Sequence, residues 1–557
     1  GEIGADSEGY KRHFNQEWNR VYRGMVEVCL ELGRYQDAIE YADRSKARNL
    51  VELIATRDAY PGGVMPENTR QRLQELKTAI AVEERRLQQQ ENPDPTPLNQ
   101  LRQEKQKLEP YQPLPFDKMQ ELLDNKTAIL EWYILGDKFL TFTLTNQGTG
   151  NGEQNLKLWT SSEEDLNNLI NWSNAYLNDY RNRDNRQWPL SLPQRLETLA
   201  QILHLDEILH NLRQNFPTCE KLILIPHLYL HLFPLHALPV SLPSSPLSPP
   251  GRGAGGEGNE IKFLQDLFPQ GVTYAPNCQF LKQVKNRPRP HFNQLFAIQN
   301  PTQDLQFTDL EVEAIQSLFH PHQVLKHNEA EKTGIIQPNP TKPTQPETQE
   351  SLKDAHCAHF SCHGYFNFED PLKSALILAN SEFTPPPPTD DPSRYLPLEG
   401  NKLLDLEKCL TLEDILRLDL RNCRLVTLSA CETGVTDPTS TSDEYIGLPS
   451  GFILAGSPNV ISTLWAVNDL STALLMIRFY QNLQQKQTTV TLALRAAQNW
   501  LRTASIQAII DWSREFENPT LDEAINKEFE HYNEEERLEP GNFDRPYYWA
   551  AFCAIGC

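Results

Sequence analysis

The segment "LVTLSACETG", residues 425–434, runs from an apolar stretch into a glycine turn, and Cys431 stands where the two meet. A short apolar run followed by a turn predicts a strand that is buried on both faces of a sheet. Two interpretations of Cys431 are open at this point. It is either a core-filling cysteine or a nucleophile held at the rim of the sheet.

Further apolar runs alternate with helical patterns through the last half of the chain. Strands are expected at 294–300, 358–362, 374–379, 424–430 and 459–465, with a helix near 308–319. This alternation predicts an α/β fold with a buried parallel sheet and helices on both faces. The uncharged stretch 446–468 could be mistaken for a membrane span, but Pro449 and Pro458 divide it into a short buried helix, a turn and a strand.

The composition restricts the class of partner. The 557 residues include 74 acidic and 52 basic side chains, a formal net charge of −22, so nucleic acid and anionic membrane are poor partners and proteins or peptides are favoured. Ten cysteines without a Cys-x-x-Cys pair or a secretory leader indicate reduced thiols and a cytoplasmic protein. At about 150 residues per domain, three or four units are expected.

No metal or cofactor is predicted. The histidines His227, His231 and His236 are clustered, but no acidic residue or cysteine lies near them at ligand spacing. We therefore interpret them as core and turn residues.

The N-terminal part is predicted to be helical. Residues 20–32 and 37–58 carry apolar side chains at helical spacing on either side of Gly33, which predicts two antiparallel helices. The pattern of Gly33, Tyr35 and Ala38 resembles a tetratricopeptide repeat (TPR), the alternative being an ordinary helix pair. Because the chain opens at Gly1 in what reads as mid-domain sequence, further repeats are expected upstream.

In the middle of the chain the predicted secondary structure changes from helices alone to a mixture of strands and helices. Two leucine-bearing runs within 69–109, separated by prolines, predict a helical hairpin that acts as a spacer. Residues 127–145 read as two strands joined at Gly136-Asp137, and 221–238 as another strand that ends in turns. Residues 241–260 read as a surface loop rich in Pro, Gly and Ser.

Two strands end in reactive residues. "AHFSCHG" stops at His363-Gly364 and "LVTLSACETG" at Cys431, so the two side chains can converge at the carboxyl edge of one parallel sheet. An imidazole beside a thiol can raise the thiolate fraction and can protonate a leaving amine. The backbone N–H groups at Gly364 and Cys431 could hold a developing oxyanion. This constellation predicts acyl transfer and, on a polypeptide, proteolysis.

The blocks "HFSCHGYFNFEDPLKSALIL", "LVTLSACETG" and "DEYIGLPSGFILAGSPNVISTLWAVND" resemble the CHAT domain, a caspase-like cysteine peptidase module related to separase and often found behind TPR repeats, especially in cyanobacteria. The resemblance implies His363 as general base and acid, Cys431 as nucleophile, and Gly364 with Cys431 as oxyanion donors. It also implies four parts: a TPR-like hairpin at 1–60, a helical spacer at 61–111, a non-catalytic caspase-like half at 112–290 and a catalytic half at 291–557.

The same resemblance suggests a specificity pocket. "LWAVND", residues 464–469, is similar to a separase segment whose final Asp selects arginine, which implies that Asp469 selects Arg before the scissile bond. Trp465 and Ser429 would line this pocket, and Asp443 and Glu444 are reserve candidates for the acid. The alternative is that Asp469 caps the helix that follows it.

Three functions remain open from the sequence. The first is a regulatory cysteine endopeptidase that recognises one protein partner through the repeats and the CHAT cleft. The second is a catalytically silent scaffold that binds proteins, and the third is an acyl transferase or deamidase with the same dyad. The presence of both His363 and Cys431 favours the endopeptidase.

Overall fold

The computed structural model describes most of the chain. Described are residues 19–47, 51, 54–55, 59, 65–90, 93–147, 155–181, 187–241, 262–287, 289–338, 347–365, 367, 371–384, 394–397, 402–429, 447–486 and 488–556. The chain divides into two compact units. The first comprises 1–119, 277–286 and 442–444, and the second comprises 120–276, 287–441 and 445–557.

The first unit begins with a pair of helices. Residues 19–31 are helical, and α2 (Tyr35–Ser45) follows directly after a tight turn at Gly33, whose φ of +68° favours glycine. The rings of Tyr22 and Tyr41 lie 6.4 Å apart, so the second helix folds back along the first. Large apolar side chains remain exposed on this pair, Val28 at 48% and Leu32 at 65% among them.

The predicted second helix, 37–58, is interrupted after Ser45, and residues 51, 54 and 55 are helical again. The expected run was 37–58, but α2 ends at Ser45, where Lys46 is extended and Ala47 adopts a φ of +48°. The amide of Asn277 donates to the Lys46 carbonyl at 2.6 Å, a tertiary contact that takes up a carbonyl the helix would have used. Helical periodicity could not reveal this break because the contact comes from a distant segment.

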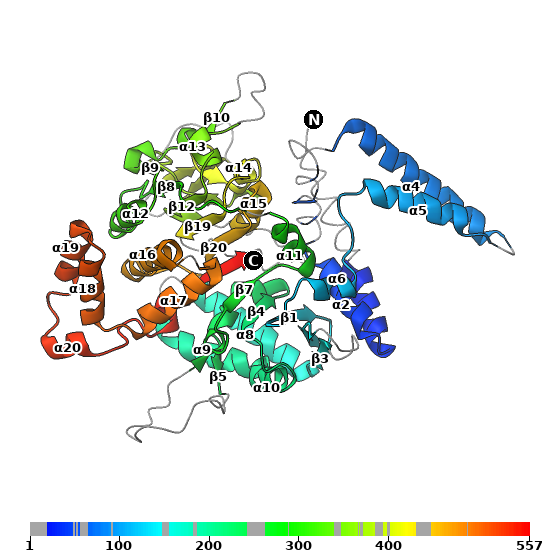
Figure 1. Cartoon of the computed structure of the whole chain (residues 1–557), viewed down its shortest axis with the longest axis horizontal. Helices are drawn as coiled ribbons and strands as arrows, with labels where there is room; N and C mark the ends of the chain where they lie inside the picture. Colours follow the sequence, from blue (N-terminus) through cyan, green and yellow to red (C-terminus); the bar gives the residue numbers. More distant parts are fainter. Residues whose placement is uncertain are drawn as a thin grey trace. The chain divides into compact units, whose positions relative to one another are not determined.

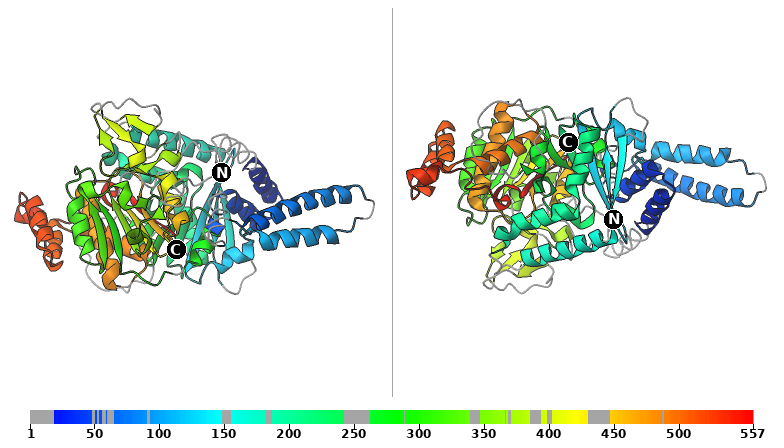
Figure 2. Two further views of the ribbon diagram at one scale, coloured as in Figure 1. Left: turned by 90° about the horizontal axis from the view of Figure 1, so that it is seen from above. Right: turned by 90° about the horizontal axis from the view of Figure 1, so that it is seen from below.

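The predicted helical hairpin within 69–109 is confirmed, and its role as a spacer stays a prediction. Helices α4 (Glu67–Gln88) and α5 (Thr96–Leu108) lie side by side (Figures 1 and 2). Their apolar contact is small, and they are also linked by ion pairs from Arg72 to Glu104 and from Arg102 to Glu84. The first unit also contains α11 (Cys278–Lys285).

A single mixed sheet forms the core of the second unit. Its strand order is β3-β2-β1-β4-β7-β21-β20-β19-β12-β8-β9. The strands are β1 (Thr127–Ile134), β2 (Phe139–Leu144), β3 (Leu156–Thr160), β4 (Lys221–Ile225), β7 (Gly271–Tyr274), β8 (Leu295–Gln299), β9 (His322–Lys326), β12 (Cys357–Ser361), β19 (Leu425–Ser429), β20 (Asn459–Thr463) and β21 (Phe552–Gly556). β2, β3 and β21 bring the antiparallel pairings, and the other neighbours are parallel.

This sheet confirms the predicted α/β class. It is continuous across the expected boundary at 290, because β7 from the earlier part pairs with β21 from the later part. The division of the chain into four parts stays a prediction.

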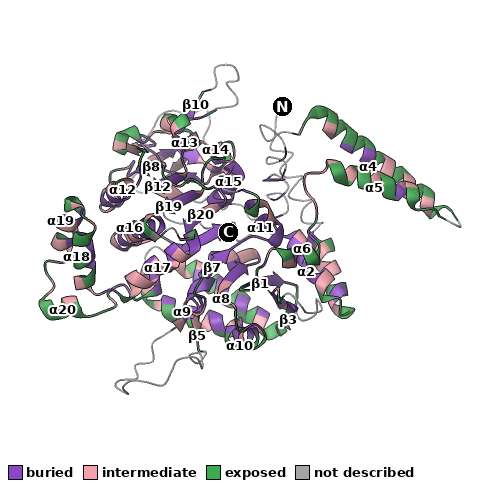
Figure 3. Cartoon of the chain, viewed as in Figure 1, coloured by how far each residue is buried: buried purple, intermediate pink, exposed green. Residues whose placement is uncertain are grey.

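Helices cover both faces of the sheet, as β12 demonstrates. His359 contacts Glu311 on α12 (Thr308–Gln316) and Tyr480 on α16 (Asp469–Lys486). The next residue, Phe360, points to the other face and packs 5.2 Å from Phe452 on α15 (Leu448–Ala455). Burial follows this layering, with the strands between the helices coloured as buried (Figure 3).

The segment 374–379 was predicted wrongly as a strand of the main sheet. It contributes β14 (Ala375–Leu376), which lies in a small antiparallel sheet between β13 (Gly364–Tyr365) and β18 (Leu410–Thr411). The connection from β13 to β14 is too short for a crossover between parallel strands, which takes a dozen or more residues. The chain therefore turns back on itself instead.

The remaining helices complete the layers. They are α6 (Phe116–Glu121), α8 (Glu163–Arg181), α9 (Trp188–Ile202), α10 (Leu205–Asn215), α13 (Glu350–Lys353), α14 (Leu412–Ile415), α17 (Val490–Thr503), α18 (Ile506–Glu515), α19 (Pro519–Glu528), α20 (Glu534–Leu538) and α21 (Pro546–Trp549). Within the described part of the chain, no helix combines the length and the apolar character needed to cross a membrane.

The clustered histidines occupy the core and a turn, as predicted. The Nδ1 atom of His227 accepts the Ile134 N–H at 2.8 Å, and His236 lies 2.8 Å from the Tyr274 hydroxyl. Burial lowers the pKa of His236 to about 3. His231 lies on a short 3-10 turn, Leu228–Leu232.

Candidate active site

The two strands that end in reactive residues are neighbours. β12 and β19 run parallel, and the last pair in their register joins Ser361 to Ser429 (Figure 1). His363 follows Ser361 by two positions and Cys431 follows Ser429 by two positions. The predicted adjacency of the strand ends is therefore confirmed. Cys431 itself lies outside the described residues.

Backbone contacts hold His363 at the end of β12. Its carbonyl accepts the Ile377 N–H at 2.9 Å, and Gly364 directly begins β13, opposite Leu376 of β14. The small antiparallel sheet thus fixes the point at which the chain leaves the main sheet. The imidazole is 30% exposed, so it can reach a substrate.

An acid that the sequence analysis missed orients this imidazole. Nε2 of His363 lies 3.0 Å from each carboxylate oxygen of Asp304, in the segment after β8. β8 is the other neighbour of β12, so three consecutive strands deliver residues to one edge. The sequence does place an aspartate just after a predicted strand, in "NPTQDL" at 300–305. Only the order of the strands in the sheet shows that this aspartate lies next to His363.

Asp304 is suited to this role because it stays ionised. Burial raises the pKa of Asp304, but the hydrogen bond from Thr302 and the interaction with His363 outweigh burial, and the net pKa lies below its usual value. An ionised carboxylate accepts hydrogen bonds and donates none, so Nε2 carries the proton. Nδ1 is then the nitrogen that can take a proton from a thiol.

We expect Asp304→Asn to lower kcat roughly 10-fold or more, because an amide neither selects the productive tautomer nor stabilises an imidazolium. The measurement is steady-state kinetics on a cleavable peptide. Asp165→Asn is the matched control, since Asp165 forms a similar 2.9 Å pair with His204 elsewhere in the second unit. Equal kcat for the Asp304 variant and the wild type would contradict the orienting role.

A buried polar network lies beneath the strand ends. Glu311, on α12, accepts hydrogen bonds from His359 Nε2 at 2.7 Å and from the Ser361 hydroxyl at 3.0 Å. Tyr480, on α16, lies 3.1 Å from His359 Nδ1 and donates to Thr427 of β19 at 2.7 Å. The network therefore ties both reactive strands to two helices.

Asp469 lies at the start of α16 and contacts the segment that carries Asp304. Its carboxylate accepts the Phe307 N–H at 2.8 Å. The pKa of Asp469 is raised, first by burial and also by the charge of Glu311, while the Phe307 N–H and His363 act in the opposite direction. The sequence analysis considered Asp469 as the N-cap of this helix. The capping side chain is instead that of the preceding residue, Asn468, whose Oδ1 accepts the Ser471 N–H at 3.0 Å.

The other predicted pocket residues have different placements. Ser429 is 6% exposed, and its hydroxyl has no hydrogen-bond partner among the described residues. Trp465 is completely buried in the core, where its indole N–H donates to the Tyr547 carbonyl at 3.1 Å. Asp443 and Glu444 lie outside the described residues.

Comparisons with solved structures find similar chains of low identity. Separase from Saccharomyces cerevisiae, in its complex with securin, is 10% identical with a TM-score of 0.40, over 79% of this chain and 30% of that one. The cysteine proteinase gingipain R, described as Arg-specific, is 8% identical with a TM-score of 0.30, over 65% of this chain and 67% of that one. This chain therefore spans less than a third of the length of the separase chain.

Sequence comparisons give a firmer assignment. A search of curated proteins returns no match to the chain. The family model described as "CHAT domain" matches residues 194–557. The matched part holds β12, β19 and the candidate site, and it spans well over half of the sequence. The chain belongs to the CHAT domain family.

Proposed function

We propose that the protein is a cysteine endopeptidase in which Cys431 is the nucleophile and His363 the general base and acid. The observation that carries the proposal is the position of His363. His363 lies two residues after β12, which pairs with β19 in a register that joins Ser361 to Ser429, and its Nε2 lies 3.0 Å from the Asp304 carboxylate. Catalytic groups in such folds gather at the carboxyl edge of the parallel sheet, and this partly exposed imidazole, paired with a carboxylate, lies there.

In the proposed reaction His363 acts in turn as a base and as an acid. Nδ1 of His363 takes the thiol proton of Cys431, and the thiolate attacks the substrate carbonyl to form a C–S bond. The carbonyl oxygen becomes an oxyanion that accepts hydrogen bonds from the backbone N–H groups of Gly364 and Cys431. The imidazolium protonates the leaving amine as the C–N bond breaks. Water, deprotonated by His363, then attacks the thioester. The C–S bond breaks, the acid product leaves, and the imidazolium returns its proton to the Cys431 thiolate.

Substrate choice is proposed to involve Asp469. Its half-buried carboxylate has no lysine or arginine partner among the described residues, so an incoming guanidinium would supply the missing counter-charge. An aspartate side chain at the same position would be repelled. The substrate is accordingly a protein cut after Arg. We propose that the exposed apolar side chains of the N-terminal helix pair select this protein.

The reaction class is tested by incubating the full chain with a peptide library and analysing the products by mass spectrometry. Hydrolysed peptide bonds support the endopeptidase. Conversion of glutamine to glutamate in intact peptides would indicate a deamidase instead, and unchanged peptides that nevertheless bind would indicate a scaffold.

The residue preference has its own test in peptides that differ only before the scissile bond, carrying Arg, citrulline or Asp. We expect Arg to exceed its uncharged analogue citrulline roughly 10- to 100-fold in kcat/KM, because a charge-assisted hydrogen bond is lost with the charge. Asp469→Asn should remove most of this difference, and the control Asp511→Asn on α18 should retain it. A wild-type preference for Asp would refute the assignment. An Arg preference that survives Asp469→Asn would transfer the role to another acid.

A further inference from the structure

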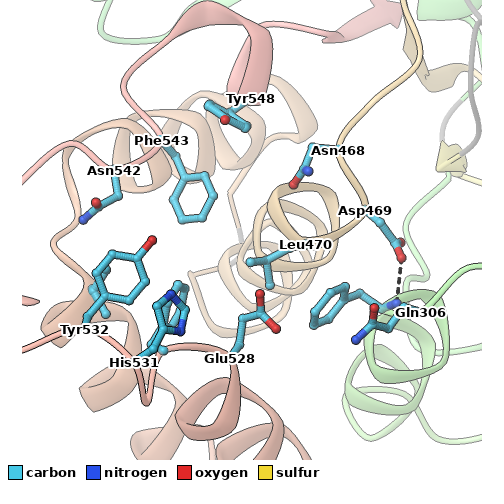
Figure 4. Close-up of a pocket in the computed structure, with 13 residues that line it drawn as sticks. Gln306, Asn468, Asp469, Leu470, Glu528, His531, Tyr532, Asn542, Phe543 and Tyr548 are labelled. Atoms are coloured by element: carbon cyan, nitrogen blue, oxygen red, sulfur yellow. Dashed lines mark hydrogen bonds between the residues drawn. The ribbon is translucent and has the colours of Figure 1, made fainter.

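A cavity of about 480 Å³ opens beside Asp469 at the start of α16 (Figure 4). One wall comes from the residues just before α12 and from the start of α16, and it includes Phe307, Asp469 and Leu470. The opposite wall comes from the helices inserted between α17 and β21, residues 505–549. Cavities of this volume accommodate a long side chain or a small ligand.

Aromatic rings form much of the inserted wall. Tyr532 and Phe529 pack with ring centroids 6.0 Å apart, and Phe543 meets Tyr548 edge to face at 5.3 Å. Figure 4 shows Tyr532 and Phe543 lining the cavity opposite Leu470. Aromatic faces attract a cation within about 6 Å of the ring centre.

The aromatic wall is held in place before any ligand binds. Arg537, on α20, donates from Nε to the Tyr532 carbonyl at 2.9 Å and from Nη2 to the Phe529 carbonyl at 3.0 Å. These hydrogen bonds fix the backbone turn that carries the rings. A preordered wall reduces the entropy lost on binding. The Arg537 guanidinium is thus hydrogen-bonded to these backbone carbonyls.

The charge in the cavity is acidic. Glu528 at the end of α19 and Asp469 at the rim both line it, and its described lining includes no lysine or arginine. Glu528 is half-buried, and no hydrogen bond or ion pair is found for its carboxylate among the described residues. In Figure 4 this carboxylate faces the space beside Leu470 and His531. A half-buried acid without a counter-charge favours a cationic ligand.

We propose that this cavity binds a second basic side chain, Lys or Arg, of the polypeptide substrate, with Glu528 as its counter-charge and Tyr532 and Phe543 as its aromatic walls. The placement as a substrate subsite rests on the proposed peptidase function. Asp469 at the rim accepts the Phe307 N–H at 2.8 Å, and Asp304, three residues before Phe307, lies 3.0 Å from His363 Nε2, so a chain lying across the catalytic histidine passes the mouth of the cavity. The substrate then carries two basic residues, one selected by Asp469 and one by Glu528.

The test measures binding without cleavage, in the full chain carrying Cys431→Ala. The probes are fluorescent, acetylated peptides with one fixed Arg, in which a second position, moved along the peptide, holds either Arg or citrulline. We expect the second Arg to tighten binding roughly 10-fold at one position, as expected for a charge-assisted contact. Glu528→Gln should erase this gain and leave the contribution of the fixed Arg. Glu530→Gln is the matched control, because Glu530 is exposed, lies two residues further on and does not line the cavity.

Tyr532→Leu provides a second variant, which should reduce the same gain while keeping an apolar side chain. Thermal unfolding of each variant verifies the fold. Equal binding of the Arg and citrulline probes at every position overturns the inference, as does a gain that survives Glu528→Gln. The peptidase proposal fails separately, if the wild-type chain cleaves no peptide while the Glu528-dependent gain persists.

Discussion

Peptide cleavage by the Cys431→Ala and His363→Ala proteins is expected to fall by on the order of 10³- to 10⁶-fold, the range seen when a nucleophile or its base is removed. Alanine at 431 leaves no atom to form the acyl intermediate. Alanine at 363 leaves the thiol without a base and the leaving amine without a proton donor. Because the two groups act as a unit, the double variant should be about as slow as either single variant.

The control for this experiment is His327→Ala. His327 resembles His363 in being partly exposed and paired with a carboxylate, at 2.8 Å from Asp309. It should retain cleavage. The variants should also unfold at nearly the wild-type temperature, since a 30% exposed His363 contributes little to packing. Turnover by Cys431→Ala above the buffer rate would reject Cys431 as the nucleophile.

The largest stability change is expected from Glu311→Ala, which should lower the free energy of unfolding by about 2–5 kcal/mol. Glu311 is 1% exposed and accepts from both His359 and Ser361. Removing its carboxylate leaves two buried donors of β12, His359 Nε2 and the Ser361 hydroxyl, without their acceptor.

Urea unfolding of the full chain measures this change, with Glu313→Ala as the matched control. Glu313 lies on the same helix, is only partly buried, and forms no hydrogen bond or ion pair within the described residues. Its replacement should alter stability by less than about 0.5 kcal/mol. Similar losses for the two variants would mean that helix packing, rather than the network, accounts for the cost.

Much of the fold could be predicted from local patterns. The strands around 294–300, 358–362, 424–430 and 459–465 were identified because short apolar runs between helical segments are typical of strands buried on both faces. The hairpin at 127–145 was recognised from its turn residues, and β1 and β2 do pair antiparallel there. Each of these patterns depends on residues that are close in sequence.

Features that depend on distant segments were missed. The end of α2 at Ser45 involves a contact from Asn277, and Asp304 gained its importance from the neighbouring positions of β8 and β12. The sequence analysis made no prediction for the cavity wall at 529–548, because its rings come together only in the folded chain. The burial of the Trp465 ring against Trp188 likewise depends on a contact between segments that are far apart in the sequence.

The sequence by itself determined that a histidine and a cysteine follow two strands of a parallel sheet, because apolar patterns and turn residues involve only residues that are close in sequence. The tertiary structure decided which strands are neighbours, which carboxylate holds His363, and where an acidic, aromatic cavity opens beside Asp469. Those features arise when the sheet orders its strands and the 505–549 insertion packs against the start of α16. The physical reason is that burial and electrostatics depend on distance in space, which a linear pattern of residues does not encode.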